Sequence, residues 1–232
     1  LEIVNLLGGF PLAVESVAVY LGRFSRHISF SDFLDRLKKE GFPEWDLRIR
    51  EKEPGIRHGE QSMVITLKPT IEKLTEAEKT VLGYAACLPP DNIPLSWIKN
   101  LITEKYPEFK DSPEPGYPDP WSRLRDRLID LRLLKLPDPG LNKKDLFIVK
   151  MHRIVQKILP ECLEESIIER LGKRMNLEVF LLKKAEEIQN DPGAVNRTGE
   201  VLSLFEVSKL FVTHDSHLSK NIASLCSHIL YR

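Results

Sequence analysis

The sequence predicts a mainly α-helical protein that contains one short β-hairpin. Apolar residues recur at three- and four-residue steps through most of the chain, which is the period of a buried helix face. Residues 75–78 (Thr-Glu-Ala-Glu) have the pattern of a capping box, a strong signal for a helix start. A turn sequence at 137–140 (Pro-Asp-Pro-Gly) separates two short apolar runs that are typical of paired strands.

Length, composition and charge exclude several classes of protein. The 232 residues are 42% hydrophobic and 29% charged, which is typical of a globular chain long enough to bury a core. No apolar run approaches the ~18 residues of a membrane span, so we expect no membrane partner and a cytoplasmic location. Basic and acidic residues both number 34, and this balance does not favour a nucleic-acid partner.

The cysteines are widely separated and fit neither a disulfide framework nor the spacing of zinc ligands. We expect buried thiols at Cys87, Cys162 and Cys226. The chain begins at Leu1, already inside an apolar helical pattern, and this favours a segment of a longer protein.

Residues 1–60 are predicted to form a helical segment. The pattern of residues 1–7 indicates the end of a helix, which the glycines at 8–9 stop because they supply the backbone freedom of a C-cap. Pro11 starts a second helix with one apolar face. A third helix is predicted at 31–39.

A second domain is predicted at 61–160, after a charged linker with prolines and glycines at 41–60. Its first helical run contains Pro69, which we expect to break or kink the helix. The helix that the capping box starts ends at Pro89. Two further helices follow, and Asp119 caps the second of them.

A two-stranded hairpin follows these helices. Leu133, Leu134 and Leu136 indicate its first strand, and residues 146–150 indicate its second. Three helices followed by such a hairpin form the plan of a winged-helix domain, a variant of helix-turn-helix. A short helix that ends near Pro160 completes the domain.

Residues 161–232 are predicted to form antiparallel helices, like the first turns of a helical repeat array. After a turn at 190–193, two more helices are expected, with apolar faces within 201–211 and 218–229. Before that turn a long helix carries a regular apolar pattern at Ile167, Leu171, Met175, Val179 and Leu182.

The chain carries no recognisable catalytic motif. Glycine-rich phosphate-binding patterns, the nucleophile elbow and the zinc-protease pattern are all missing from the sequence. Of six histidines only His214 and His217 are close together, and a stable zinc site needs more ligands than two. We therefore expect that this chain alone is not an enzyme and binds neither a metal nor a nucleotide.

Two segments about 140 residues apart resemble motifs of one protein family. Residues 7–13 (Leu-Gly-Gly-Phe-Pro-Leu-Ala) resemble its G-[LF]-P-L-A motif, and Met151-His152 stands where the family carries Met-His-Asp. Residues 152–156 (His-Arg-Ile-Val-Gln) are similar to the H-R-[LI]-V-Q of bacterial and fungal members with C-terminal tetratricopeptide repeats. Residues 1–160 therefore resemble the NB-ARC group of signal-transduction NTPases with numerous domains, the STAND NTPases.

The resemblance implies a nucleotide-controlled switch. In the family an upstream P-loop domain holds ADP, or ATP with Mg, and residues corresponding to Gly9, Phe10 and Pro11 lie on the adenine side. His152 corresponds to the histidine that reaches the β-phosphate, and Arg153 replaces the aspartate that follows it, where it would meet phosphate or a neighbouring acid. Exchange of ADP for ATP would release the winged helix. The implied partners are the P-loop domain, downstream helical repeats of the same chain, and further copies of the protein on activation.

The same residues support other interpretations. Residues 8–11 are also typical of a corner between two helices, and His152 is also typical of a polar cap. A winged-helix transcription regulator with a helical effector or dimerisation domain would read DNA through Arg123, Arg125 and Arg127. Aspartates interleave with these arginines, which is also typical of a solvated, salt-bridged face. A third interpretation is a helical interaction module with no nucleotide role.

Overall fold

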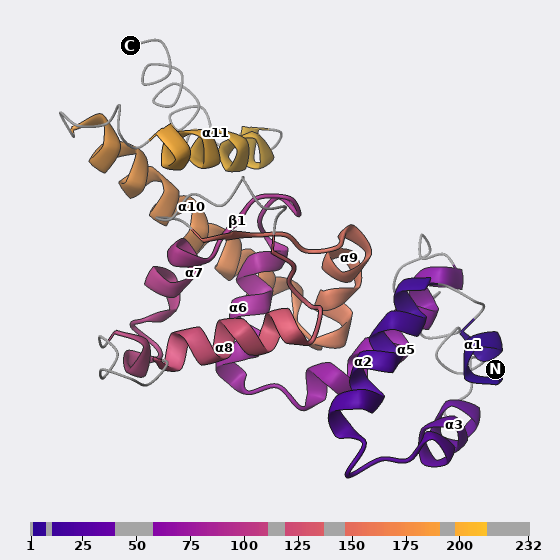
Figure 1. Cartoon of the computed structure of the whole chain (residues 1–232). Helices are drawn as coiled ribbons and strands as arrows, with labels where there is room; N and C mark the ends of the chain where they lie inside the picture. The colour runs from indigo at the N-terminus through magenta and orange to yellow at the C-terminus, as the bar shows by residue number, and fades with distance from the viewer. Residues whose placement is uncertain are drawn as a thin grey trace.

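The computed structural model describes residues 2–7, 11–39, 58–110, 119–136, 147–190 and 198–212. In these ranges the chain is mainly helical, with ten α-helices and one small antiparallel sheet of two strands. Figure 1 shows the N-terminal helices at one end, while α10 (Ile167–Gln189) and α11 (Thr198–Val212) extend on the other side of a central group. The mainly helical fold predicted from the sequence is confirmed for this part of the chain.

The N-terminal end consists of four helices: α1 (Glu2–Leu6), α2 (Pro11–Phe24), α3 (Phe30–Lys39) and α5 (His58–Glu72). Pro11 is the first residue of α2, as predicted, because the proline ring presets the backbone of a first turn and no N–H is needed there. Helix α2 packs on α5, and α1 packs on α3. The glycines predicted to stop the first helix lie outside the described residues.

The break that was one of the two outcomes predicted at Pro69 does not occur, because α5 runs through Pro69 from His58 to Glu72. A proline inside a helix costs roughly 3 kcal/mol through a lost hydrogen bond and a clash. Tertiary packing offsets this cost, because Val64, Leu67 and Ile71 of α5 are almost completely buried. Helix α5 begins just before the predicted domain boundary and contacts helices of both predicted domains.

The central group contains five helical elements and both strands: α6 (Glu76–Ala86), β1 (Ile93–Pro94), α7 (Leu95–Ile102), η1 (Pro107–Phe109), α8 (Pro120–Asp130), β2 (Ile148–Val149) and α9 (Arg153–Cys162). The predicted caps of α6 and α8 are confirmed. The Glu78 N–H donates to Thr75 Oγ1 at 3.3 Å, and the Thr75 N–H donates to Glu78 Oε2 at 2.7 Å. The Ser122 N–H donates to Asp119 Oδ1 at 3.0 Å.

The strands pair differently from the predicted hairpin. Strand β2 pairs antiparallel with β1, with Ile93 opposite Val149, and β1 was not predicted. The predicted pairing of 133–136 with 146–150 is reduced to one bridge between Lys135 and Lys150. Leu133 and Leu134 are both buried, so this run lacks the alternation of a half-exposed strand and fills the core instead. The predicted turn at 137–140 lies outside the described residues.

Helix α9 includes Pro160 and ends at Cys162, close to the end predicted near Pro160. Ser166 then starts α10 with a second capping box, in which the Ser166 N–H donates to Glu169 Oε2 at 2.8 Å. Helix α11 packs on α10. The helix predicted within 218–229 lies outside the described residues.

The apolar pattern predicted for the long helix exists, but most of it faces solvent. Ile167, Leu171, Met175 and Val179 are exposed, and Leu182 is half-buried. The buried side of α10 is shifted around the helix and consists of residues with no exposed surface: Leu177, Leu181, Ala185 and Ile188.

We expect Thr75→Ala to lower the free energy of unfolding by about 1–2 kcal/mol, because it removes the hydroxyl that caps α6. The same hydroxyl donates to the buried carboxylate of Glu78 at 2.9 Å. Urea unfolding followed by circular dichroism measures the change. Thr75→Ser keeps the hydroxyl and should remain close to the wild-type value. Equal destabilisation by both substitutions would show that the cap is not the cause.

Candidate functional site

The candidate site lies where β2 leads into α9. The Met151 side chain is buried, and its N–H donates to the Pro90 carbonyl at 2.7 Å, which anchors the backbone before His152. His152 has an extended backbone and is the N-cap of α9, with its side chain exposed. His152, the histidine of the Met-His motif, therefore lies at the start of a ten-residue helix.

The hydrogen bonding of His152 favours one tautomer of the neutral ring. Its Nδ1 accepts the Ile154 N–H at 3.2 Å. A nitrogen that accepts a hydrogen bond carries no proton, so in the neutral ring the proton lies on Nε2. His152 thus offers one N–H donor at the N-terminus of α9.

The pKa of His152 is lowered from its ordinary value, first by partial burial and then by the positive charge of Lys135. The carboxylate of Glu15 acts in the opposite direction. Burial and a nearby cation both disfavour the charged imidazolium. The neutral imidazole, with its N–H donor, is therefore favoured at neutral pH.

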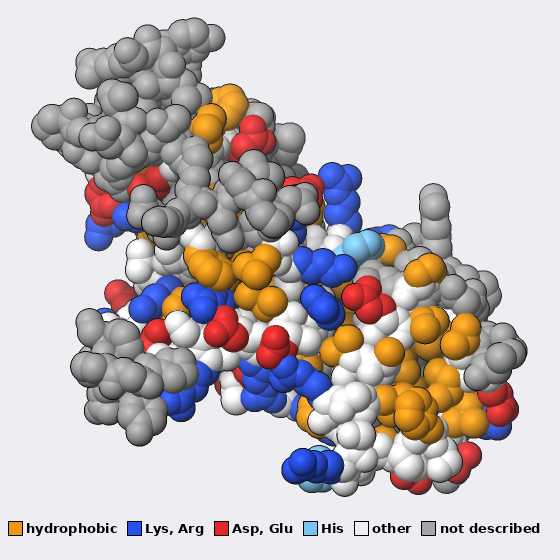
Figure 2. All heavy atoms as spheres, in the orientation of Figure 1, with side chains coloured by type: hydrophobic (Ala, Val, Ile, Leu, Met, Phe, Trp, Pro, Cys, Tyr) orange, Lys and Arg blue, Asp and Glu red, His pale blue; other side chains and the backbone are white. Residues whose placement is uncertain are grey.

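Helix α2 contributes to the same site through Glu15, in the second turn after Pro11. Glu15 Oε2 lies 4.0 Å from Lys135 Nζ, and both charges act on His152. Helix α2, which begins at Pro11, is thus linked to Lys135 through one exposed ion pair. Figure 2 shows a histidine, several basic side chains and a carboxylate gathered near α9.

Of the predicted adenine-side residues, the structure describes only Pro11. Its side chain is exposed at the first position of α2. Gly9 and Phe10 lie outside the described residues.

Arg153 meets a neighbouring acid, one of the two partners suggested by the sequence. Arg153 Nη2 lies 3.5 Å from Asp91 Oδ2, and both side chains are well exposed. Gln156, from the same motif, donates from Nε2 to the carbonyls of Ala86 at 3.1 Å and Leu88 at 2.5 Å. Gln156 thus satisfies carbonyl groups at the end of α6 and fixes α9 against it.

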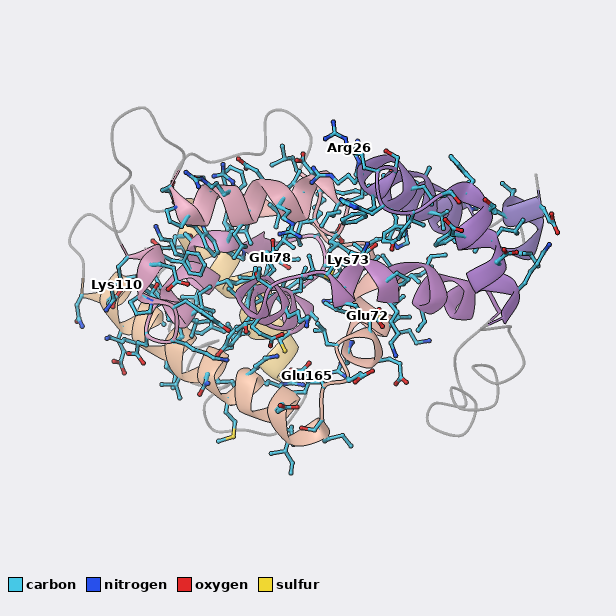
Figure 3. The ribbon with its side chains drawn as sticks, turned by 90° about the horizontal axis from the view of Figure 1, so that it is seen from below. Arg26, Glu72, Lys73, Glu78, Lys110 and Glu165 are labelled. Atoms are coloured by element: carbon cyan, nitrogen blue, oxygen red, sulfur yellow. The ribbon has the colours of Figure 1, made fainter. Side chains whose placement is uncertain are left out.

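The arginines predicted for DNA contact lie on α8, and two of them are engaged within the protein. The Arg125 guanidinium lies 4.3 Å from the centre of the Phe147 ring, and its Nε is 2.8 Å from Asp126 Oδ1. Arg127 Nε lies 3.3 Å from Oε1 of the buried Glu78 of α6, which is labelled in Figure 3. Arg123 also has an interaction partner.

The other candidate chemistries find little support in the described residues. Cys87 and Cys162 are free thiols, and Cys162 is buried as predicted, whereas Cys87 is only partly buried. Burial raises the pKa of Cys162 to about 12. Cys226, His214 and His217 lie outside the described ranges. Within those ranges no group of three metal-binding side chains occurs, and no helix is long and apolar enough to cross a bilayer.

Sequence reasoning missed two participants in this site, Glu15 and Lys135. Neither belongs to a motif, and both reach His152 through tertiary packing. No protein-family model, curated protein or solved structure matched the chain in the comparisons.

We expect the pKa of His152, measured by NMR titration of its ring protons, to lie below that of an unfolded peptide histidine. Lys135→Gln should raise this pKa and Glu15→Gln should lower it further, because each removes one named charge. Lys184→Gln on α10 is the control and should leave it unchanged. Between the folded and unfolded pKa values the unfolded chain binds more protons, so stability should rise with pH. Similar responses to all three substitutions would contradict this arrangement.

We expect no salt-sensitive binding of duplex DNA, because Arg125 and Arg127 are engaged with Phe147, Asp126 and Glu78. Fluorescence anisotropy of labelled duplexes across a salt series measures this. Several phosphate contacts would give a steep fall of affinity with salt. A steep fall that Arg123→Ala abolishes would favour the transcription-regulator alternative instead.

Proposed function

We propose that this chain is the regulatory segment of a nucleotide-switched signalling NTPase of the STAND type. In this proposal an upstream P-loop domain binds ADP, and this chain holds the ADP-bound state closed. The residues on the nucleotide side are Pro11, at the start of α2, and His152, at the start of α9. The C-terminal helices would relay the binding of a partner, and activation would lead to assembly of several copies.

The observation that carries the proposal is that α2, which begins at Pro11, contributes a charge to the surroundings of His152. Pro11 and His152 belong to separate motifs, yet Glu15 and Lys135 link α2 to the surroundings of His152. A diphosphate placed there would meet the Nε2–H of His152, the first-turn N–H groups of α9 and the cation of Lys135. Each of these groups is of a kind that stabilises an anion.

The central group supports a winged-helix interpretation of residues 61–160. The order of α6, β1, α7 and α8, followed by the Lys135–Lys150 bridge and β2, fits three helices with a small hairpin. The Arg153–Asp91 pair connects the start of α9 to the loop before β1. A phosphate bound by His152 would therefore restrain the whole central group.

A switch requires that the nucleotide bind the closed state more tightly than the open state. ADP would do so if its β-phosphate contacts His152 only in the closed arrangement. ATP, with Mg in the P-loop domain, would lose that contact and release the segment. This chain would bind and orient the nucleotide, and it would contribute no catalytic residue.

The test is the nucleotide content of the longer protein that includes the P-loop domain. Wild-type protein, purified and then denatured, should release bound ADP. His152→Ala should retain at least about tenfold less, because the donor to the phosphate is lost. His27→Ala, which removes an exposed histidine after α2, is the matched control and should keep its ADP.

Three results would contradict the proposal. Equal ADP content in the His152→Ala and wild-type proteins would show that His152 does not hold the nucleotide. The absence of a P-loop domain from the natural protein, or of any nucleotide from the pure wild-type sample, would leave the helical interaction module as the better interpretation.

A further inference from the structure

The outer side of α10 is an apolar surface that no other described element covers. Four residues at four-residue steps form it, with Ile168 beside them. The exposed fractions are 79% for Ile167, 54% for Leu171, 65% for Met175 and 63% for Val179. Below, this row of four side chains is called the α10 row. Side chains on the outer edge of α10 project away from the molecule in Figure 3.

The α10 row is separate from the side on which α10 packs. The residues facing α6, α7 and α11 are fully buried and include Leu177, Leu181 and Ala185. A Cβ atom at Gly172 would meet no atom within 4 Å, so the backbone beside the row is also open. Contiguous exposed apolar side chains on a folded protein are typical of an interaction surface.

A basic cavity adjoins the first two turns of the α10 row. It lies between the end of α6, the start of α9 and the start of α10, and its volume is about 570 Å³. Ile167 and Leu171 of the row line it, together with four cationic side chains: Arg153, Lys157, Arg170 and Arg174. None of the described residues that line this cavity is acidic.

We propose that the α10 row and this cavity dock an acidic amphipathic helix of a partner protein. The apolar face of such a helix would cover Ile167, Leu171, Met175 and Val179. Its carboxylates would lie against the cations of α9 and α10, where opposite charges direct the partner to one side of the row. This surface adjoins the His152 site at the start of α9, but docking on it does not require the nucleotide role proposed for His152.

A second copy of this chain fits this surface poorly, because the described lining of its own cavity is basic and offers no acidic side chain to face the same cations. Residues 213–232 of this chain are also poorly matched, since they contain one acidic and two basic residues.

The test uses the 232-residue chain and fluorescent helical peptides of ~20 residues. One peptide carries leucines on one face and glutamates on the other, and its counterpart carries lysines in place of the glutamates. Fluorescence anisotropy should show binding of the acidic peptide, at least about tenfold weaker binding of the basic one, and an affinity that falls with salt.

Two variants localise the binding. The double substitution Leu171→Ser with Met175→Ser should weaken the acidic peptide about tenfold, and so should Arg170→Glu. Leu202→Ser removes a comparably exposed leucine on α11, and Lys110→Glu reverses an exposed charge beyond η1 (Figure 3). These two controls should bind like the wild type.

Several results would overturn the proposal. Failure of the full chain to bind the acidic peptide, or equal binding of both peptides, would contradict the proposal. So would control variants that lose as much affinity as the α10 variants. Sedimentation supplies a further outcome. A wild-type dimer that becomes a monomer with Leu171→Ser and Met175→Ser would show that a second copy occupies the row.

Discussion

The packing of α5 between α2 and α9 is the constraint on which the rest of the structure depends. Val64, Leu67 and Ile71 are buried in this contact, and each contributes about 1.5–3 kcal/mol relative to an exposed side chain. Because α5 contacts both neighbours, it fixes the start of α2 relative to the start of α9. The environment of His152 follows from this arrangement, since Glu15 belongs to α2 and Lys135 to the central group.

Ion pairs add specificity to this packing. Arg23 at the end of α2 pairs with Asp130 at the end of α8, and exposed pairs of this kind contribute little free energy. The Arg127–Glu78 pair is different, because the Glu78 side chain is 4% exposed and removal of Arg127 would leave a buried charge with fewer partners. These pairs join α8 to α2 at the N-terminal end and to α6 within the central group.

The apolar pattern of α10 does not determine which side of the helix is buried. This helix carries apolar residues on two sides, and α6, α7 and α11 cover only the side with Leu177 and Leu181. The α10 row, with the basic cavity beside it, provides the two components of an amphipathic docking surface. The site near His152 and this surface both include the start of α9, where Arg153 lines the cavity next to His152.

The sequence by itself determined the features that depend on local backbone chemistry. The caps at Thr75 and Asp119 and the helix start at Pro11 were predicted correctly, because each partner lies within three residues. Only the tertiary structure decided which strand pairs with β2, whether the chain continues through Pro69, and which side of α10 is buried. These outcomes depend on contacts between residues far apart in the chain, whose burial energy overrides local preference. Tertiary packing likewise decided that Glu15 and Lys135 act on His152.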